Sequence, residues 1–203
     1  MVVVSINVED FGSHMLQSIS ELESRLNINL PLFEKILLVE TGTVEQVLSI
    51  LTNSETDVKI LKQKESYKLI QREIHIINKK TGEKLAYAKS NIIPSNLPHE
   101  IIMQIKRKYH GIGTIIISSE LETFRKILKI GYNSKTRSVF RIYQIMYRGK
   151  VAFEIKEVFY KTKAKVAEPV YKNSIPGGST MKSFRKKDPK YNSGSQDYSY
   201  IPQ

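Results

Sequence analysis

The sequence contains no cysteine. Without thiolates the chain cannot form disulfides, iron–sulfur clusters, zinc–thiolate sites or a cysteine nucleophile, so its chemistry depends on carboxylates, hydroxyls, Arg, Lys and four histidines. The histidines have no ligand spacing, so we expect no metal site. Because no run approaches the roughly 18 apolar residues of a membrane span, and the first residues do not resemble a signal peptide, we expect a soluble, cytoplasmic chain without membrane association.

Positive charge is concentrated at the C-terminal end. The chain has 32 Lys and Arg against 20 Asp and Glu, a formal net charge of +12, and residues 161–203 carry nine of the bases and three of the acids. This segment is rich in Gly, Ser and Pro and poor in aliphatic residues, which predicts a basic, disordered tail after a domain over residues 1–160. Such a tail can attract nucleic acid or an acidic partner. We favour a solvated tail, because no nucleic-acid-binding module accompanies it.

Helical spacing of apolar residues marks the first part of the chain. It predicts helices over 15–26, from Pro31 through Leu38, and after Thr43, which can act as an N-cap. Two more helical stretches are expected further on, over 98–109 and 120–130. A Gly-containing loop, 110–114, and an apolar run, 115–117, separate them.

Segments rich in Ile, Val, Tyr and Phe predict five strands, at 58–63, 67–78, 84–93, 137–148 and 151–160. Turn signals at 78–82 and 147–150 join successive strands as antiparallel hairpins. Since the helices and strands are segregated rather than alternating, we expect an α+β fold with a single antiparallel sheet and helices on one face.

Two charged residues share the apolar face of their strands. Arg72 has the parity of Ile74 and Ile76, and Glu157 has the parity of Phe153. Burying either charge alone is costly, so the pattern predicts either a salt bridge between them or a pocket that receives a charged ligand.

These two interpretations stay open at this stage. The final strand also allows an alternative register, because a slip of one residue would turn a different glutamate, Glu154, inward in place of Glu157.

The same residues belong to an ordered set of short motifs that resembles chorismate pyruvate-lyase and its archaeal relatives. The similarity covers about residues 30–160. The motifs are 37–44, Arg72-Glu73-Ile74, Ala88-Lys-Ser-Asn-Ile-Ile-Pro94, Gly111-Ile112-Gly113, and Gly149-Lys150 followed by Glu157-Val158-Phe159. The resemblance implies a single antiparallel sheet with a buried cavity under helices, and conversion of chorismate to 4-hydroxybenzoate and pyruvate without metal or organic cofactor.

The resemblance also implies roles for individual residues. Arg72 matches the arginine that holds the ring carboxylate, assisted by the backbone N–H of Ile112 beside Gly113. Glu157 matches the glutamate at the oxygen-bearing end of the ring, where it assists proton transfer. The turn at Gly42 and Thr43 matches a segment that closes near the hydroxyl.

Chorismate carries a second carboxylate, and the sequence offers Arg137 or Arg141 as its partner. Outward arginines are ordinary on a basic protein, so we favour a solvated position for both. A different functional class also fits the resemblance, since the same fold serves as a ligand-sensing module in bacterial transcription regulators. Those regulators carry an N-terminal winged helix, for which the 30 or so residues before Pro31 are too few.

Overall fold

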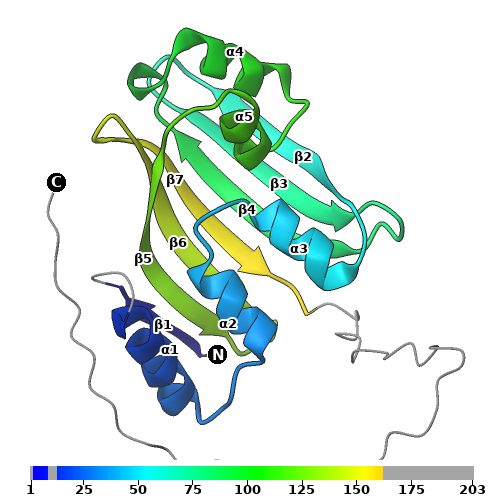
Figure 1. Cartoon of the computed structure of the whole chain (residues 1–203), viewed down its shortest axis with the longest axis vertical. Helices are drawn as coiled ribbons and strands as arrows, with labels where there is room; N and C mark the ends of the chain where they lie inside the picture. The colour runs from blue at the N-terminus through cyan, green and yellow to red at the C-terminus, as the bar shows by residue number, and fades with distance from the viewer. Residues whose placement is uncertain (1, 9–12, 162–203) are drawn as a thin grey trace, which may run out of the picture. The chain divides into compact units, whose positions relative to one another are not determined.

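The computed structural model describes residues 2–8 and 13–161 (Figure 1). Its centre is a seven-stranded sheet with the order β1-β5-β6-β7-β4-β3-β2, in which every neighbouring pair is antiparallel. The strands are β1 (Val3–Asn7), β2 (Thr56–Glu65), β3 (Ile70–Asn78), β4 (Lys84–Ile92), β5 (Phe124–Asn133), β6 (Ser138–Tyr147) and β7 (Lys150–Phe159). The predicted tail, apart from Lys161, lies outside the described residues.

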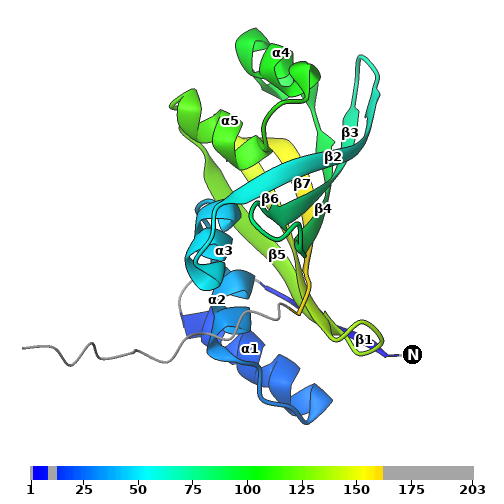
Figure 2. The same ribbon diagram turned by 90° about the vertical axis from the view of Figure 1, so that its right-hand side faces the viewer.

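Five α-helices and one short 3₁₀ turn accompany the sheet. They are α1 (Ser13–Leu26), α2 (Leu32–Val39), α3 (Val44–Thr52), η1 (Pro94–Asn96), α4 (His99–Arg107) and α5 (Ile112–Ser118). Figure 2 shows α1, α2, α3 and α5 on the same side of the sheet. The expected α+β fold with one antiparallel sheet is therefore confirmed. Within the described residues, none of the helices has the length and apolar character needed to cross a membrane.

Strand alternation places the core on the helix-covered face. In β3 the buried positions are Ile70, Arg72, Ile74 and Ile76, with Asn78 at the end of the strand. Side chains of successive residues point to opposite faces of a sheet, so this parity puts the arginine among isoleucines.

The final strand follows the same rule. In β7 the buried positions include Phe153, Ile155, Glu157 and Phe159, whereas Glu154 is exposed. The predicted register is therefore confirmed, and no slip occurs.

Tight turns fix the two expected hairpins. Arg148 and Gly149 have positive φ angles of 47° and 73°, the combination required by the two-residue turn whose twist matches the flanking strands. At the β3–β4 turn, the Asn78 side-chain oxygen accepts hydrogen bonds from the N–H groups of Lys80 and Thr81, each at 3.0 Å. An Asx-type contact of this kind replaces the ladder bonds that end there.

One expected helix is wrong. Residues 120–130 do not form a helix, because Phe124–Asn133 is strand β5. Its ladder with β6 shifts register between Ile127 and Lys129. This bulge adds one residue to the alternation, so the buried Ile127 and Ile130 are three positions apart, a spacing that mimics a helical face.

Two further elements were not anticipated. The apolar run 115–117 belongs to α5, which begins directly after Gly111 and buries Ile115 and Ile116. At the other end of the chain, β1 pairs with β5 as the outer strand of the sheet.

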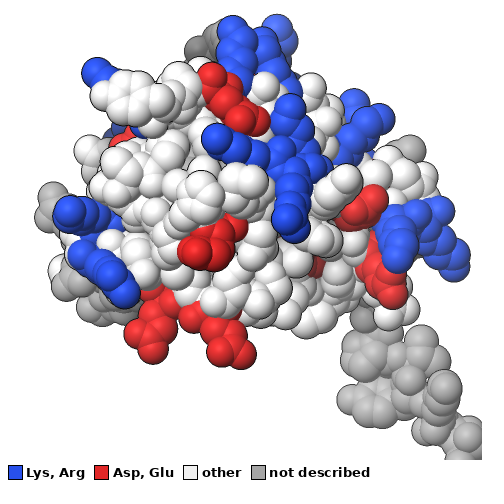
Figure 3. All heavy atoms as spheres, turned by 90° about the horizontal axis from the view of Figure 1, so that it is seen from above, with Lys and Arg blue, Asp and Glu red and all other residues white. Residues whose placement is uncertain are grey.

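Surface charge is mixed on the side of the molecule seen in Figure 3. Basic and acidic side chains are interspersed there, so this view shows no continuous basic surface. The expectation that the segment 161–203 is a solvated tail, rather than one that attracts nucleic acid or an acidic partner, stays a prediction, because all of it but Lys161 lies outside the described residues.

Candidate active site

A small cavity lies between the sheet and the helices α3 and α5. Its volume is about 30 Å³, enough for about one water molecule. Half of its lining residues are aliphatic, from β3, β4, β6, β7, α3 and α5. Four charged residues also line it: Glu45, Arg72, Arg125 and Glu157. The cavity thus contains both inward charges predicted from strand parity.

Arg72 is buried at one end of this cavity, with 1% of the residue exposed. Its Nε donates to Gln63 Oε1 at 2.6 Å, its Nη1 donates to the His110 carbonyl at 3.0 Å, and its Nη2 donates to the Ile105 carbonyl. These bonds connect β3 to β2, to helix α4 through Ile105, and to the segment between α4 and α5 through His110. All three acceptors are neutral.

The electrostatic surroundings leave Arg72 without a counter-ion. No ion pair involving Arg72 occurs in the described part of the chain. Burial lowers its pKa to about 10, and the charge of Glu65 offsets only part of this effect. A guanidinium has five N–H donors, of which these three bonds use three, leaving two for a ligand. An uncompensated buried cation with free donors favours binding of an anion.

Glu157 lies on β7 with 4% of the residue exposed. One carboxylate oxygen accepts from Arg141 Nε at 2.8 Å, and the other accepts from the Tyr143 hydroxyl at 2.9 Å. The two donors come from β6, whose Arg141 pairs directly with Glu157 in the ladder. The glutamate is thus held in a fixed orientation at the cavity wall by two hydrogen bonds.

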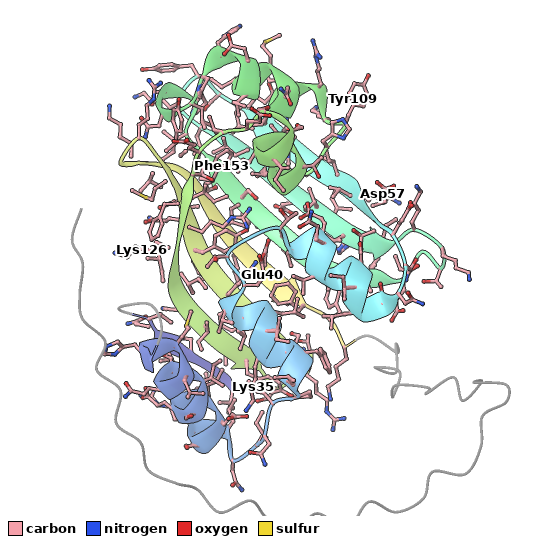
Figure 4. All side chains as sticks on the ribbon, viewed as in Figure 1. Lys35, Glu40, Asp57, Tyr109, Lys126 and Phe153 are labelled. Atoms are coloured by element: carbon pink, nitrogen blue, oxygen red, sulfur yellow. The ribbon has the colours of Figure 1, made fainter. Side chains whose placement is uncertain are left out.

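Arg141 is neutralised by two carboxylates. Besides Glu157, it contacts Glu40, through Nη2 to Oε2 at 3.2 Å and through Nη1 to the backbone carbonyl. Burial alone lowers the pKa of Arg141, but the neighbouring Glu157, Tyr143 and Glu40 together raise it further than burial lowers it. Figure 4 shows Glu40 on the connection between α2 and α3, so this pair fastens that connection to the sheet.

Tyr143 is buried and packs against two arginines, Arg125 of β5 and Arg141 of β6. Its ring centroid lies 4.9 Å from the Arg141 guanidinium carbon and 5.9 Å from that of Arg125. Desolvation, followed by the negative charge of Glu157, raises the pKa of the Tyr143 hydroxyl well above its usual value. The hydroxyl therefore stays protonated and donates to Glu157.

Glu45, on the first turn of α3, is the second acidic residue that lines the cavity. Its carboxylate lies against two glycines: a Cβ at Gly111 would be 2.5 Å from Oε1, and a Cβ at Gly113 would be 3.1 Å from Oε2. A side chain at either position would displace the carboxyl group. Desolvation raises the pKa of Glu45, with further contributions from Glu157 and other charges.

The structure brings together most, but not all, of the predicted site residues. Arg72, Glu157, Ile112 and Gly113 line the cavity. Thr43 is buried behind them, with its Cγ2 3.1 Å from the position of a Cβ on Gly113, and it precedes the first residue of α3 without a side-chain capping bond.

Three expectations about charged residues are settled by these contacts. The salt bridge considered between Arg72 and Glu157 is not formed, since the partner of Glu157 is Arg141. The solvated position favoured for Arg141 is wrong, because that residue is 1% exposed. Arg137 is exposed in the β5–β6 turn, as expected, and Gly42 is exposed beside the cavity rather than lining it.

Comparison with known proteins identifies the family of the chain. Residues 35–166 match the model of the Rv2949c-like chorismate pyruvate-lyase family. The chain belongs to this family. In the described residues no cluster of three or more His, Asp or Glu side chains has the arrangement of a metal site.

Curated relatives agree with the family match. The protein MJ0807 of Methanocaldococcus jannaschii, provisionally named a lyase, is 35% identical over an alignment of 155 residues, and the match covers 67% of this chain and 83% of the relative. The chorismate pyruvate-lyase of Mycobacterium leprae is 26% identical over 63% of this chain and 74% of its own length. That of Mycobacterium tuberculosis is 27% identical over 63% and 79%.

Sequence reasoning missed several members of the site. Arg125 was placed in a helix, and its signal was hidden by the β5 bulge. Glu45 had the appearance of an ordinary first-turn acid of a helix. Arg141 shares the inward parity of Val139, Tyr143 and Ile145 in β6, but from the sequence it is a candidate only for the second carboxylate, and the frequency of solvated arginines on basic proteins outweighs that parity.

Proposed function

We propose that this chain is a chorismate pyruvate-lyase, which converts chorismate to 4-hydroxybenzoate and pyruvate in the cavity between the sheet and helices α3 and α5. The observation that carries this proposal is Arg72, a buried cation in the cavity with neutral hydrogen-bond partners only. Family membership supplies the reaction class, and the lone arginine fits a carboxylate substrate.

In the proposed complex the ring carboxylate binds Arg72. The planar guanidinium offers two parallel N–H donors, a geometry that lysine does not have. Gly113 and Ile112 line the same cavity. We assign to the backbone N–H of Ile112 a second hydrogen bond to the ring carboxylate. Binding an anion here compensates the charge that burial left without a counter-ion.

At the other end, Glu157 faces the oxygen-bearing carbons of the ring. The C–O bond to the enolpyruvyl group breaks with its electron pair going to the ether oxygen, and the ring carbon that bears the hydroxyl loses its proton. We assign the acceptance of that proton to the Glu157 carboxylate. The enolpyruvate gains a proton and becomes pyruvate, so the two products together have the atoms of chorismate.

Because loss of the side chain makes the ring aromatic, the reaction is downhill and depends on positioning more than on strong acid–base catalysis. The Arg141–Glu157–Tyr143 contacts meet this need, since they fix the carboxylate before substrate arrives.

Access to the site requires movement. A cavity of about 30 Å³ holds about one water molecule, so an aromatic ring enters only if the lining side chains or the covering helices α3 and α5 shift. Arg72 contacts the carbonyl of Ile105 in α4 and that of His110 on the segment leading into α5. Replacement of these contacts by ligand contacts would couple binding to that movement.

The test is to incubate the purified full-length chain with chorismate and to measure 4-hydroxybenzoate by absorbance and pyruvate by a coupled assay. Equal amounts of the two products, lost in Arg72→Met and retained in Gln71→Met, support the proposal. Gln71 is a matched control because it is the neighbouring residue on the opposite, exposed face of β3. Thermal stabilisation by 4-hydroxybenzoate without turnover would overturn the lyase and favour a sensing module. No turnover and no stabilisation would overturn both.

A further inference from the structure

The proposed substrate has two carboxylates, and Arg72 accounts for only one. Among the residues that line the cavity, Arg125 is the other cationic side chain. We infer that Arg125 binds the second carboxylate, the one carried on the ether arm of the ligand. This inference rests on the proposed lyase function and deepens it by defining a second anchoring point.

The hydrogen bonding of Arg125 leaves it available. Its Nη1 donates to the Thr41 carbonyl at 2.9 Å, and that is the one side-chain hydrogen bond it makes within residues 13–161. It takes part in no ion pair there. Since a guanidinium has five N–H donors, most of those of Arg125 remain for a ligand. The single bond to Thr41 holds the side chain near the connection between α2 and α3.

Contacts with the sheet also restrict the orientation of the Arg125 side chain. Arg125 pairs in the ladder with Ile145, whose side chain lines the cavity, so both project to the helix-covered face. The guanidinium lies 5.9 Å from the Tyr143 ring, a cation–π distance that limits its conformations. The arginine is therefore positioned before a ligand binds.

The alternative cation, Arg141, does not suit this role. Both its carboxylate partners, Glu157 and Glu40, are already within ion-pair distance, and it is absent from the lining of the cavity. Recruiting it would break a buried, neutralised cluster, which costs several kcal/mol. Arg125 requires no such exchange.

The order of the strands places Arg72 and Arg125 on opposite sides of Glu157. Arg72 is on β3 and Arg125 on β5, with β4, β7 and β6 between them. Four strand spacings amount to roughly 19 Å between backbones, but both side chains line one cavity of about 30 Å³, so their ends lie closer together than their strands. Glu157 on the intervening β7 lies between them. A ligand with carboxylates at its two ends would present its central carbons to this glutamate.

The arrangement predicts selectivity for dicarboxylates. The experiment compares three ligands by isothermal titration: 4-hydroxybenzoate, the same ring with a 3-carboxymethoxy arm, and that compound with its arm converted to the neutral amide. Each is titrated into the wild type, Arg125→Gln, Arg125→Lys and Lys126→Gln. Lys126 is the matched control, as it is the next residue on β5, has the same charge and points away from the sheet at its outer edge (Figure 4).

Arg125→Gln should weaken binding of the dicarboxylate about 10- to 100-fold, because one charge-assisted contact is lost. The affinities for 4-hydroxybenzoate and for the amide should change about twofold or less. Arg125→Lys is expected to regain part of the lost affinity, and Lys126→Gln to match the wild type. In turnover, KM for chorismate should rise more than kcat falls.

Other outcomes overturn the inference. If Arg125→Gln weakens all three ligands equally, the residue is structural; if it weakens none, the second carboxylate binds elsewhere. Either result leaves the lyase proposal intact, because wild-type binding of 4-hydroxybenzoate is measured in the same series. Failure of the wild type to bind any of the three ligands would overturn the proposed function and this inference together.

Discussion

Arg72 and Arg141 are equally buried, each at 1% exposure, but their surroundings are opposite. Arg141 lies between two carboxylates and its pKa is raised. Arg72 has only neutral acceptors and its pKa is lowered, to about 10. A buried charge that the protein neutralises is part of the scaffold, whereas one left without a counter-ion is available for a ligand. Arg141 therefore positions Glu157, whereas Arg72 is the residue that we propose binds substrate.

The largest expected effect comes from removing the lone cation. Arg72→Met should lower kcat/KM for chorismate by about 1,000-fold, or about 4 kcal/mol of transition-state stabilisation, because the carboxylate loses its main partner. The free energy of unfolding, measured by urea denaturation, should change by much less, since loss of three hydrogen bonds is offset by removal of an uncompensated buried charge. A large loss of stability with retained kcat/KM would show that Arg72, like Arg141, has a structural role.

Breaking the neutralised cluster should have the opposite signature. Arg141→Met leaves Glu157 buried without its cation and is expected to lower the free energy of unfolding by about 3 kcal/mol. Arg25→Met is the matched control, because it removes the exposed ion pair with Glu21, which contributes about 0.5 kcal/mol. Equal losses in the two variants, measured by urea denaturation followed by circular dichroism, would contradict the assigned role of Arg141.

A third variant separates orientation from proton transfer. Glu157→Gln keeps a similar shape but cannot accept a ring proton, so kcat should fall about 100-fold with little change in the affinity for 4-hydroxybenzoate. Steady-state kinetics and titration of the product measure the two effects. Glu154→Gln, on the exposed face of the same strand, should match the wild type. A fall in affinity without a fall in kcat would assign Glu157 to binding instead.

The smallest effect concerns Glu45, whose raised pKa gives stability a defined pH dependence. A carboxyl with a raised folded-state pKa stabilises the fold below its unfolded pKa and loses that contribution as pH rises through the folded value. Glu45→Gln stays neutral at every pH. It should match the wild type at pH 4 and be more stable at pH 8 by about 1 kcal/mol.

Urea denaturation of Glu45→Gln and the wild type from pH 4 to pH 8 tests this sign. Glu122→Gln, an exposed carboxyl on the surface, is the control and should follow the wild type throughout. Parallel curves for Glu45→Gln and the wild type would show that burial of this carboxyl has no energetic consequence.

Much of the fold and part of the site could be predicted from sequence patterns. Parity alone identified Arg72 and Glu157 as inward residues, because both strands are regular over the relevant positions. The pairing of Glu157 with Arg141 was missed although the hairpin between their strands was predicted, because a register shift in the ladder between Ile145 and Met146 decides which residue faces Arg141. Strand parity states the face of a residue but not its partner across the sheet.

The β5 strand illustrates a second limit. Its bulge between Ile127 and Lys129 changes the spacing of buried residues from two to three, and a period of three is the signal of a helix. Because the sequence predicts a helix over 120–130, it does not place Arg125 in the cavity. A bulge is stabilised by contacts distant in sequence, so local periodicity does not reveal it.

The central claim is that the lone buried arginine receives the ring carboxylate, and a crystal structure of the wild-type protein with 4-hydroxybenzoate tests it most directly. We predict the ligand inside the cavity, with a carboxylate oxygen within hydrogen-bond distance of the Arg72 guanidinium and the phenol oxygen toward Glu157. A ligand bound in the reverse orientation, or outside the cavity with Arg72 still bonded only to Gln63 and the two carbonyls, would contradict the account.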